Sequence, residues 1–84
     1  MKTRPKTIFD KRYSCLIADL VVIRKNKGWS QRELAKQARV SHCFIGRTET
    51  KERRLDLVEA IDLMRVLGLK NQDIVKKIAE LINA

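Results

Sequence analysis

The chain has 84 residues and a formal net charge of +9, because 19 lysines and arginines outnumber 10 acidic residues. This length suits one small domain, and the absence of any run of 18 apolar residues argues against a membrane span. A single histidine, two cysteines and no glycine-rich phosphate loop argue against an enzyme and against a metal or cofactor. A strongly basic domain without catalytic groups suggests a nucleic acid partner.

The positive charge is concentrated in two blocks. Residues 1–12 carry five basic and one acidic side chain, and residues 24–54 carry ten basic and three acidic ones. Residues 1–9 lack periodicity and contain the only proline, so we expect a flexible basic arm, either a solvated terminus or a segment that follows DNA. Residues 10–84 are then expected to form one domain, and the lack of a signal-peptide core suggests a cytoplasmic protein.

The first helix is predicted to begin after Asp10, which can cap it, and to run to about Lys27, where Gly28 supplies a left-handed position. Arg24 falls in the middle of its apolar face, where an unpaired charge would cost several kcal/mol. A carboxylate is therefore expected to reach it, with Glu49 as the candidate, unless the guanidinium extends to water. The other residues of this face are Tyr13, Leu16, Ile17, Leu20, Val21 and Ile23.

Two short helices follow with very little chain between them. Ser30 and Glu33 form the sequence of a capping box for the second helix, and Ser41 can cap a third. Residues 38–40 leave room only for a tight turn, so the two helices must cross steeply and touch. The third helix, about 41–49, is expected to bury Ile45 and Thr48 and to present a polar outer face.

A polar loop, residues 50–54, precedes a second capping-box sequence, Asp56 with Glu59, which opens a helix to about Leu67. Apolar residues surround most of that helix, so it lies in the core or meets a partner. The last helix, about 71–82, carries one apolar stripe that can either form a dimer surface or close the monomer core. The stripe consists of Ile74, Val75, Ile78, Leu81 and Ile82. Five helices and no strand signal predict an all-α bundle.

The two short helices resemble those of the Cro/CI-type, or XRE, family of helix-turn-helix regulators. The resemblance covers about residues 13–69 and implies a compact five-helix, lambda-repressor-like bundle with its helix-turn-helix at about 30–49. The matching residues are Arg24, Lys25, Gly28, Trp29, Ser30, Gln31, Leu34, Ala35, Val40, Ser41, Ile45 and Glu49.

The resemblance also implies roles for individual residues. Gln31 stands where relatives contact a phosphate, and Arg24 and Glu49 stand at positions that pair in relatives. Major-groove contacts are implied for Ser41, His42, Cys43 and Arg47, among which Arg47 is the best base reader because a guanidinium can bond guanine through two atoms. Contacts with the DNA backbone are expected from the loop, at Thr50, Lys51, Arg53 and Arg54.

The function implied is sequence-specific binding of double-stranded DNA by a transcriptional regulator, usually a repressor, acting as a homodimer on an inverted repeat. A restriction-modification controller, or a DNA-binding antitoxin with a protein partner, fits the same domain. An adaptor for a protein or RNA is the alternative from another class.

Four residues depart from the family pattern and are expected to loosen the motif. Arg39 replaces the usual turn glycine and must either adopt a left-handed conformation, at a cost of about 1 kcal/mol, or shift the turn. Thr48 replaces a large apolar residue, Lys51 replaces a helix-ending glycine, and Gly46 lies inside the third helix. We therefore expect a recognition helix that becomes more ordered on DNA.

Overall fold

The computed structural model describes residues 10–83, which form five helices and contain no strand. In chain order they are α1 (Lys11–Asn26), α2 (Gln31–Ala38), α3 (His42–Glu49), α4 (Leu57–Val66) and α5 (Asn71–Asn83). The predicted all-α bundle is confirmed. The proposed arm at residues 1–9 lies outside the described residues. No helix between residues 10 and 83 combines the length and apolar character needed to cross a membrane.

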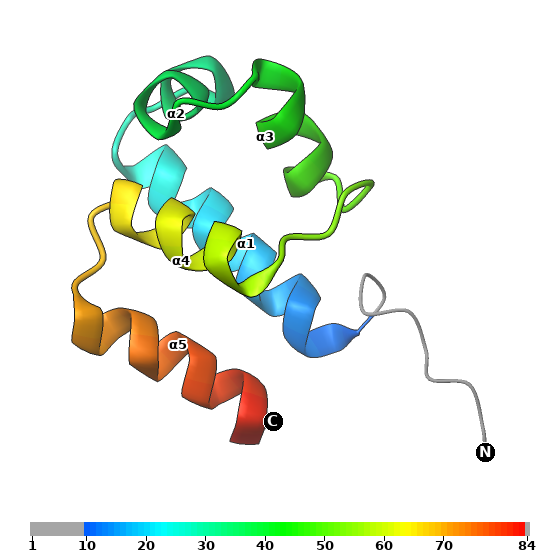
Figure 1. Cartoon of the computed structure of the whole chain (residues 1–84), viewed down its shortest axis with the longest axis vertical. Coiled ribbons are helices and arrows are strands. Elements are labelled where there is room, and N and C mark those ends of the chain that lie inside the picture. The colour runs from blue at the N-terminus through cyan, green and yellow to red at the C-terminus, as the bar shows by residue number, and fades with distance from the viewer. Residues whose placement is uncertain (1–9, 84) are drawn as a thin grey trace.

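Helices α1 and α4 form the middle of the bundle and pack against the other three helices. Figure 1 shows α2 and α3 at one end of the bundle and α5 at the other. Helix α1 packs against α3 and α5, and α4 packs against α2 and α5, whereas the most extensive contact joins α2 to α3. The recognition helix is therefore held by the rest of the bundle and does not depend on α2 alone.

The helix starts follow the local capping signals, with one exception. Asp10 accepts a bond from the Arg12 N–H at 2.8 Å, and Asp56 with Glu59 makes both bonds of a capping box. Ser30 accepts from the Glu33 N–H at 3.1 Å, which is one bond of the predicted capping box. The prediction of the second bond, from the Ser30 N–H to the Glu33 carboxylate, is wrong. The Glu33 carboxylate instead accepts a 2.8 Å bond from the Gln37 amide one turn later.

Glycine ends α1 as the sequence predicts. Gly28 adopts φ 77°, and the Trp29 N–H donates to the Arg24 carbonyl at 3.2 Å while the Gly28 N–H donates to that of Lys25. This hydrogen-bond pattern satisfies carbonyls that the last turn leaves unpaired. It also turns the chain sharply toward α2.

All five helices contribute side chains to the core. Its most deeply buried large side chains are those of Leu34, Ile45 and Met64, each 2% exposed or less. The apolar face predicted for α1 is buried at Tyr13, Leu16, Ile17 and Leu20, but Val21 and Ile23 lie at its edge and are only partly buried.

The apolar stripe of α5 divides between the core and the surface. Ile74 is 4% exposed and Ile78 and Leu81 are partly buried, whereas Val75 and Ile82 are 65% and 75% exposed. Ile74 is therefore unavailable to a partner helix and serves the monomer core, the second of the two roles expected for the stripe. The stripe is wider than the contact that α5 makes with the bundle, so only one edge of it is covered.

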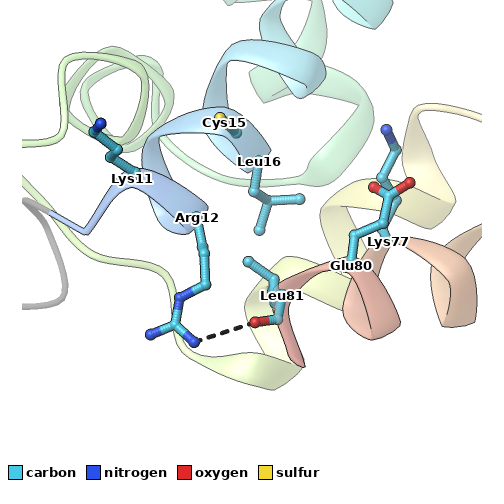
Figure 2. Close-up of a pocket in the computed structure, with 7 residues that line it drawn as sticks. All are labelled: Lys11, Arg12, Cys15, Leu16, Lys77, Glu80 and Leu81. Carbon is cyan, nitrogen blue, oxygen red and sulfur yellow. Dashed lines mark hydrogen bonds between the residues drawn. The ribbon is translucent and has the colours of Figure 1, made fainter. Parts of the chain in front are cut away.

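Polar bonds attach α5 to α1. Lys77 forms a 2.8 Å ion pair with Asp19, and the Arg12 guanidinium donates to the Leu81 carbonyl at 3.2 Å. Figure 2 shows the Arg12 to Leu81 bond beside a groove of about 260 Å³ between the two helices, with Leu16 in its lining. These bonds fix the C-terminal helix at the end of the bundle remote from α2 and α3 (Figure 1).

Two carboxylates give the fold a defined dependence on pH. Hydrogen bonds from Arg12 lower the pKa of Asp10 from 3.8 to about 2, and hydrogen bonds from Arg53 and the Asp56 N–H lower the pKa of Glu59. A carboxylate with a lowered pKa in the folded state stabilises the fold above its unfolded pKa, and this contribution disappears as the pH falls through the folded pKa.

The melting temperature should therefore stay level from about pH 6 to pH 5 and fall between about pH 4 and pH 2. Thermal unfolding followed by circular dichroism across this range measures the change. Asp10→Asn should make the decline below pH 4 shallower. An equally steep decline in the variant would contradict the role given to Asp10.

Candidate nucleic-acid interface

Helices α2 and α3 form a tight helix-turn-helix. Arg39 ends α2 with φ 58° and ψ 42°, the left-handed conformation predicted for the turn. The Val40 N–H donates to the Ala35 carbonyl at 3.0 Å, which closes the turn before Ser41 starts α3. A residue with a Cβ pays about 1 kcal/mol in this conformation, so the turn is formed against a local preference.

The outer face of α3 collects the side chains predicted to meet bases. Ser41, His42, Cys43 and Arg47 are all exposed, and Ile45 on the opposite face is 1% exposed. The Ser41 hydroxyl accepts from the Phe44 N–H at 3.0 Å and keeps its own proton available for donation. His42, Cys43 and Arg47 thus lie on the face of α3 opposite Ile45, and Ser41 is exposed at the N-terminus of the helix.

A buried ion pair attaches the end of α3 to α1. Arg24 donates to both carboxylate oxygens of Glu49, at 2.7 Å and 2.9 Å, and to the Trp29 carbonyl at 2.7 Å. The two side chains are only 8% and 13% exposed. The guanidinium does not reach water as the alternative required, and its burial is compensated by three charge-assisted or carbonyl bonds.

Gln31 joins this network from the first turn of α2. Its amide nitrogen donates to Glu49 at 2.8 Å, and the second amide hydrogen has no partner among the described residues. One carboxylate therefore holds α1, α2 and α3 together. The bond also fixes the direction of the Gln31 side chain beside the recognition helix.

The loop residues expected to contact the DNA backbone differ in how many internal hydrogen bonds their side chains make. Arg54 is exposed, with no hydrogen bond from its guanidinium within residues 10–83. The Lys51 ammonium donates to the Ser14 hydroxyl of α1 at 3.2 Å, from a backbone with φ 65°. The Thr50 hydroxyl donates to the Glu52 carboxylate at 2.8 Å. Only Arg54 in this group has a guanidinium or ammonium directed to solvent alone.

Arg53 makes intramolecular contacts that the sequence reading missed. Its guanidinium donates to both oxygens of Glu59, at 2.9 Å and 2.8 Å, and lies 4.2 Å from the centre of the Phe44 ring. Phe44 itself is partly buried and packs against the core. The sequence did contain one indication of this pair. Glu59 follows Arg53 by six residues, and its capping-box position directs its carboxylate back toward the loop that contains Arg53.

Thr48 places a hydroxyl in the core beneath the recognition helix. The residue is 2% exposed, and its Oγ1 has no hydrogen-bond partner among the described residues. Thr48 also lines a cavity of about 10 Å³ whose other lining residues are mostly aliphatic, among them Leu34 and Leu63. A buried hydroxyl without a partner costs about 1 to 3 kcal/mol.

Thr48→Val is therefore expected to raise the free energy of unfolding by about 1 kcal/mol, because valine has nearly the same shape without the polar atom. For a domain of this size the melting temperature should rise by about 4 to 8 °C. The matched control is Thr50→Val, where the hydroxyl is exposed and bonded. If both variants melt at the same temperature as the parent chain, the hydroxyl of Thr48 is not destabilising.

The geometry of α2 and α3 and the exposed polar face of α3 define a DNA-binding protein of the helix-turn-helix class. The family model described as helix-turn-helix matches residues 22–74, which is most of the chain, whereas no curated protein and no solved structure matches. The chain belongs to the XRE-type, Cro/CI-like family of helix-turn-helix proteins. Its function is sequence-specific DNA binding as a regulator of transcription.

Proposed function

We propose that this protein is a transcriptional repressor that binds an inverted repeat as a homodimer, with α3 in the major groove. The observation that carries the proposal is the exposed set Ser41, His42, Cys43 and Arg47 on a helix whose opposite face is buried. A helix fits the major groove of B-form DNA, where each base pair presents a distinct pattern of donors and acceptors. Bound there, a repressor excludes other proteins from the site.

Each base-reading residue has a chemical preference. Arg47 bonds guanine O6 and N7 together, and His42 bonds a base edge or a phosphate at the helix N-terminus. Cys43 makes an apolar contact, for which the thymine methyl group is suited. Ser41 donates its hydroxyl proton to a base or phosphate acceptor while it caps α3.

The DNA backbone is contacted from both sides of the recognition helix. Gln31 offers its second amide hydrogen from α2, and Arg54 offers an exposed guanidinium from the loop after α3. Thr50 and Lys51 lie in the same loop and are weaker candidates because their polar atoms already have internal partners. Residues 1–9 add a basic arm to residues 10–84, which we treat as one domain.

The dimer surface includes the uncovered edge of α5. Val75 and Ile82 are exposed there, and Ile78 and Leu81 are partly exposed beside them. The first turn of α4 adds Leu57 and Val58, which are 63% and 65% exposed and belong to the helix that was expected to lie in the core or meet a partner. Exposed apolar side chains of this size are costly in a monomer and gain from burial in a partner.

Selection of bound sequences from a random DNA pool tests the function directly. We expect an inverted repeat with half-sites about 34 Å apart, one helical turn, and a dimer by sedimentation. Selection of a single half-site, together with a monomer in solution, would contradict the proposed dimer but still support sequence-specific DNA binding. Weak binding without sequence preference would instead favour an adaptor for a protein or RNA.

A further inference from the structure

Arg53 lies in the loop between α3 and α4 and contacts both helices. Its side chain pairs with Glu59 in the first turn of α4 and covers the Phe44 ring in the first turn of α3. Its backbone N–H donates to the Arg47 carbonyl at 3.1 Å, near the end of α3. The residue therefore touches the recognition helix twice and α4 once, although it belongs to the loop between them.

We propose that Arg53 is a positioning residue for DNA recognition, because its side chain holds Phe44 of α3 against Glu59 of α4. Of the two neighbouring arginines, Arg54 alone contacts a phosphate. The proposal rests on the function proposed above. It reverses the role that the position of Arg53 in a basic loop suggested.

Two nitrogens of the Arg53 guanidinium already bond the Glu59 carboxylate. A bidentate pair with a carboxylate is among the strongest side-chain interactions, and a phosphate would have to displace Glu59 to replace it. Glu59 is fixed in turn by the Asp56 N–H, which donates to the same carboxylate at 3.0 Å. One face of the guanidinium lies over Phe44, so a phosphate could approach only the part of the Arg53 side chain that stays exposed, which is 37%.

The contact of Arg53 with Phe44 holds the end of α3 that the buried ion pair does not reach. Glu49, at the C-terminal end of α3, is held by Arg24, whereas Phe44 lies in the first turn beside His42 and Cys43. Two fixed points at opposite ends of an eight-residue helix determine its tilt. A change in tilt would displace Arg47 from a base edge, where bidentate bonding demands close geometry.

Salt dependence separates positioning from phosphate contact, because each phosphate contact adds about 0.9 to the slope of log affinity against log salt concentration. Arg53→Met keeps the apolar stem and removes the charge, and Arg54→Met is the matched control. We expect Arg53→Met to weaken binding to the selected operator about tenfold with an unchanged slope. Arg54→Met should lower the slope by about one.

Glu59→Gln gives the second arm of the test, because glutamine can keep the capping-box bond to Asp56 while it loses the ion pair. It should weaken operator binding about as much as Arg53→Met, and the double variant should bind no more weakly than either single one. Arg53→Lys should also bind weakly, since an ammonium cannot make the bidentate pair or cover the ring equally well.

A slope lowered by about one in Arg53→Met, with tighter binding by Glu59→Gln, would overturn the proposal and make Arg53 a phosphate ligand. Near-normal binding by Arg53→Lys would also overturn it, because a lysine can serve a phosphate. Circular dichroism at the assay temperature ensures that folded proteins are compared. Failure of the parent chain to select any operator would instead refute the proposed function.

Discussion

Glu49→Ala should lower the free energy of unfolding by about 3 to 5 kcal/mol, the largest stability loss expected for a single substitution in this domain. The variant leaves the Arg24 guanidinium, whose side chain is 8% exposed, without its carboxylate. It also removes the acceptor of the Gln31 amide, so α1 and α2 both lose the hydrogen bonds that join them to Glu49 of α3. Since small domains are stable by only about 5 to 15 kcal/mol, a substantial unfolded population is expected.

Urea unfolding measures this loss, and Glu80→Ala provides a control at an exposed carboxylate without a bond among the described residues. The double variant Arg24→Met with Glu49→Leu should recover most of the stability, because apolar side chains of similar volume replace a buried pair at little cost. A loss below about 1 kcal/mol for Glu49→Ala would show that the Arg24 guanidinium can reach water in the variant.

Arg47→Ala should remove the preference for one base pair of the operator, a loss of about 1 to 3 kcal/mol of discrimination or roughly 5-fold to 150-fold in relative affinity. The expectation follows from an exposed guanidinium on the outer face of α3, with no internal partner among residues 10–83. Because the side chain is exposed, the stability of the fold should change by less than about 0.5 kcal/mol.

Competition binding against operators with single base changes measures the effect of Arg47→Ala. Arg54→Ala is the control, and it should weaken all operators similarly while it flattens the salt dependence by about one unit. If Arg47→Ala weakens every operator by the same factor, Arg47 contacts the backbone and another residue of α3 reads that base pair.

The sequence predicted much of the fold because the relevant forces are local. Asp10, Ser41 and Asp56 cap helices through backbone groups two or three residues away, and Gly28 ends a helix through its own conformational freedom. The left-handed turn at Arg39 was expected from the resemblance, because Arg39 stands where the family usually has glycine.

Site residues were harder to interpret where a side chain had several possible partners. Position in a basic loop suggested phosphate contact for both Arg53 and Arg54, yet Arg53 is partly buried and paired with Glu59, whereas Arg54 is exposed. Arg53 turns back because Glu59 and Phe44 lie within its reach once α3 and α4 are packed. Glu33 likewise bonds the Gln37 amide one turn later in the helix, where the sequence had predicted a bond back to its cap.

By itself, the sequence determined the five helices, their ends, the helix-turn-helix and the polar face of α3, since these depend on periodicity and on neighbours along the chain. Only the tertiary structure decided how the α5 stripe divides between Ile74 in the core and Val75 on the surface. It alone also showed that Arg53 joins α3 to α4. Both outcomes depend on distances between helices, because burial and pairing are properties of packed surfaces that no single segment contains.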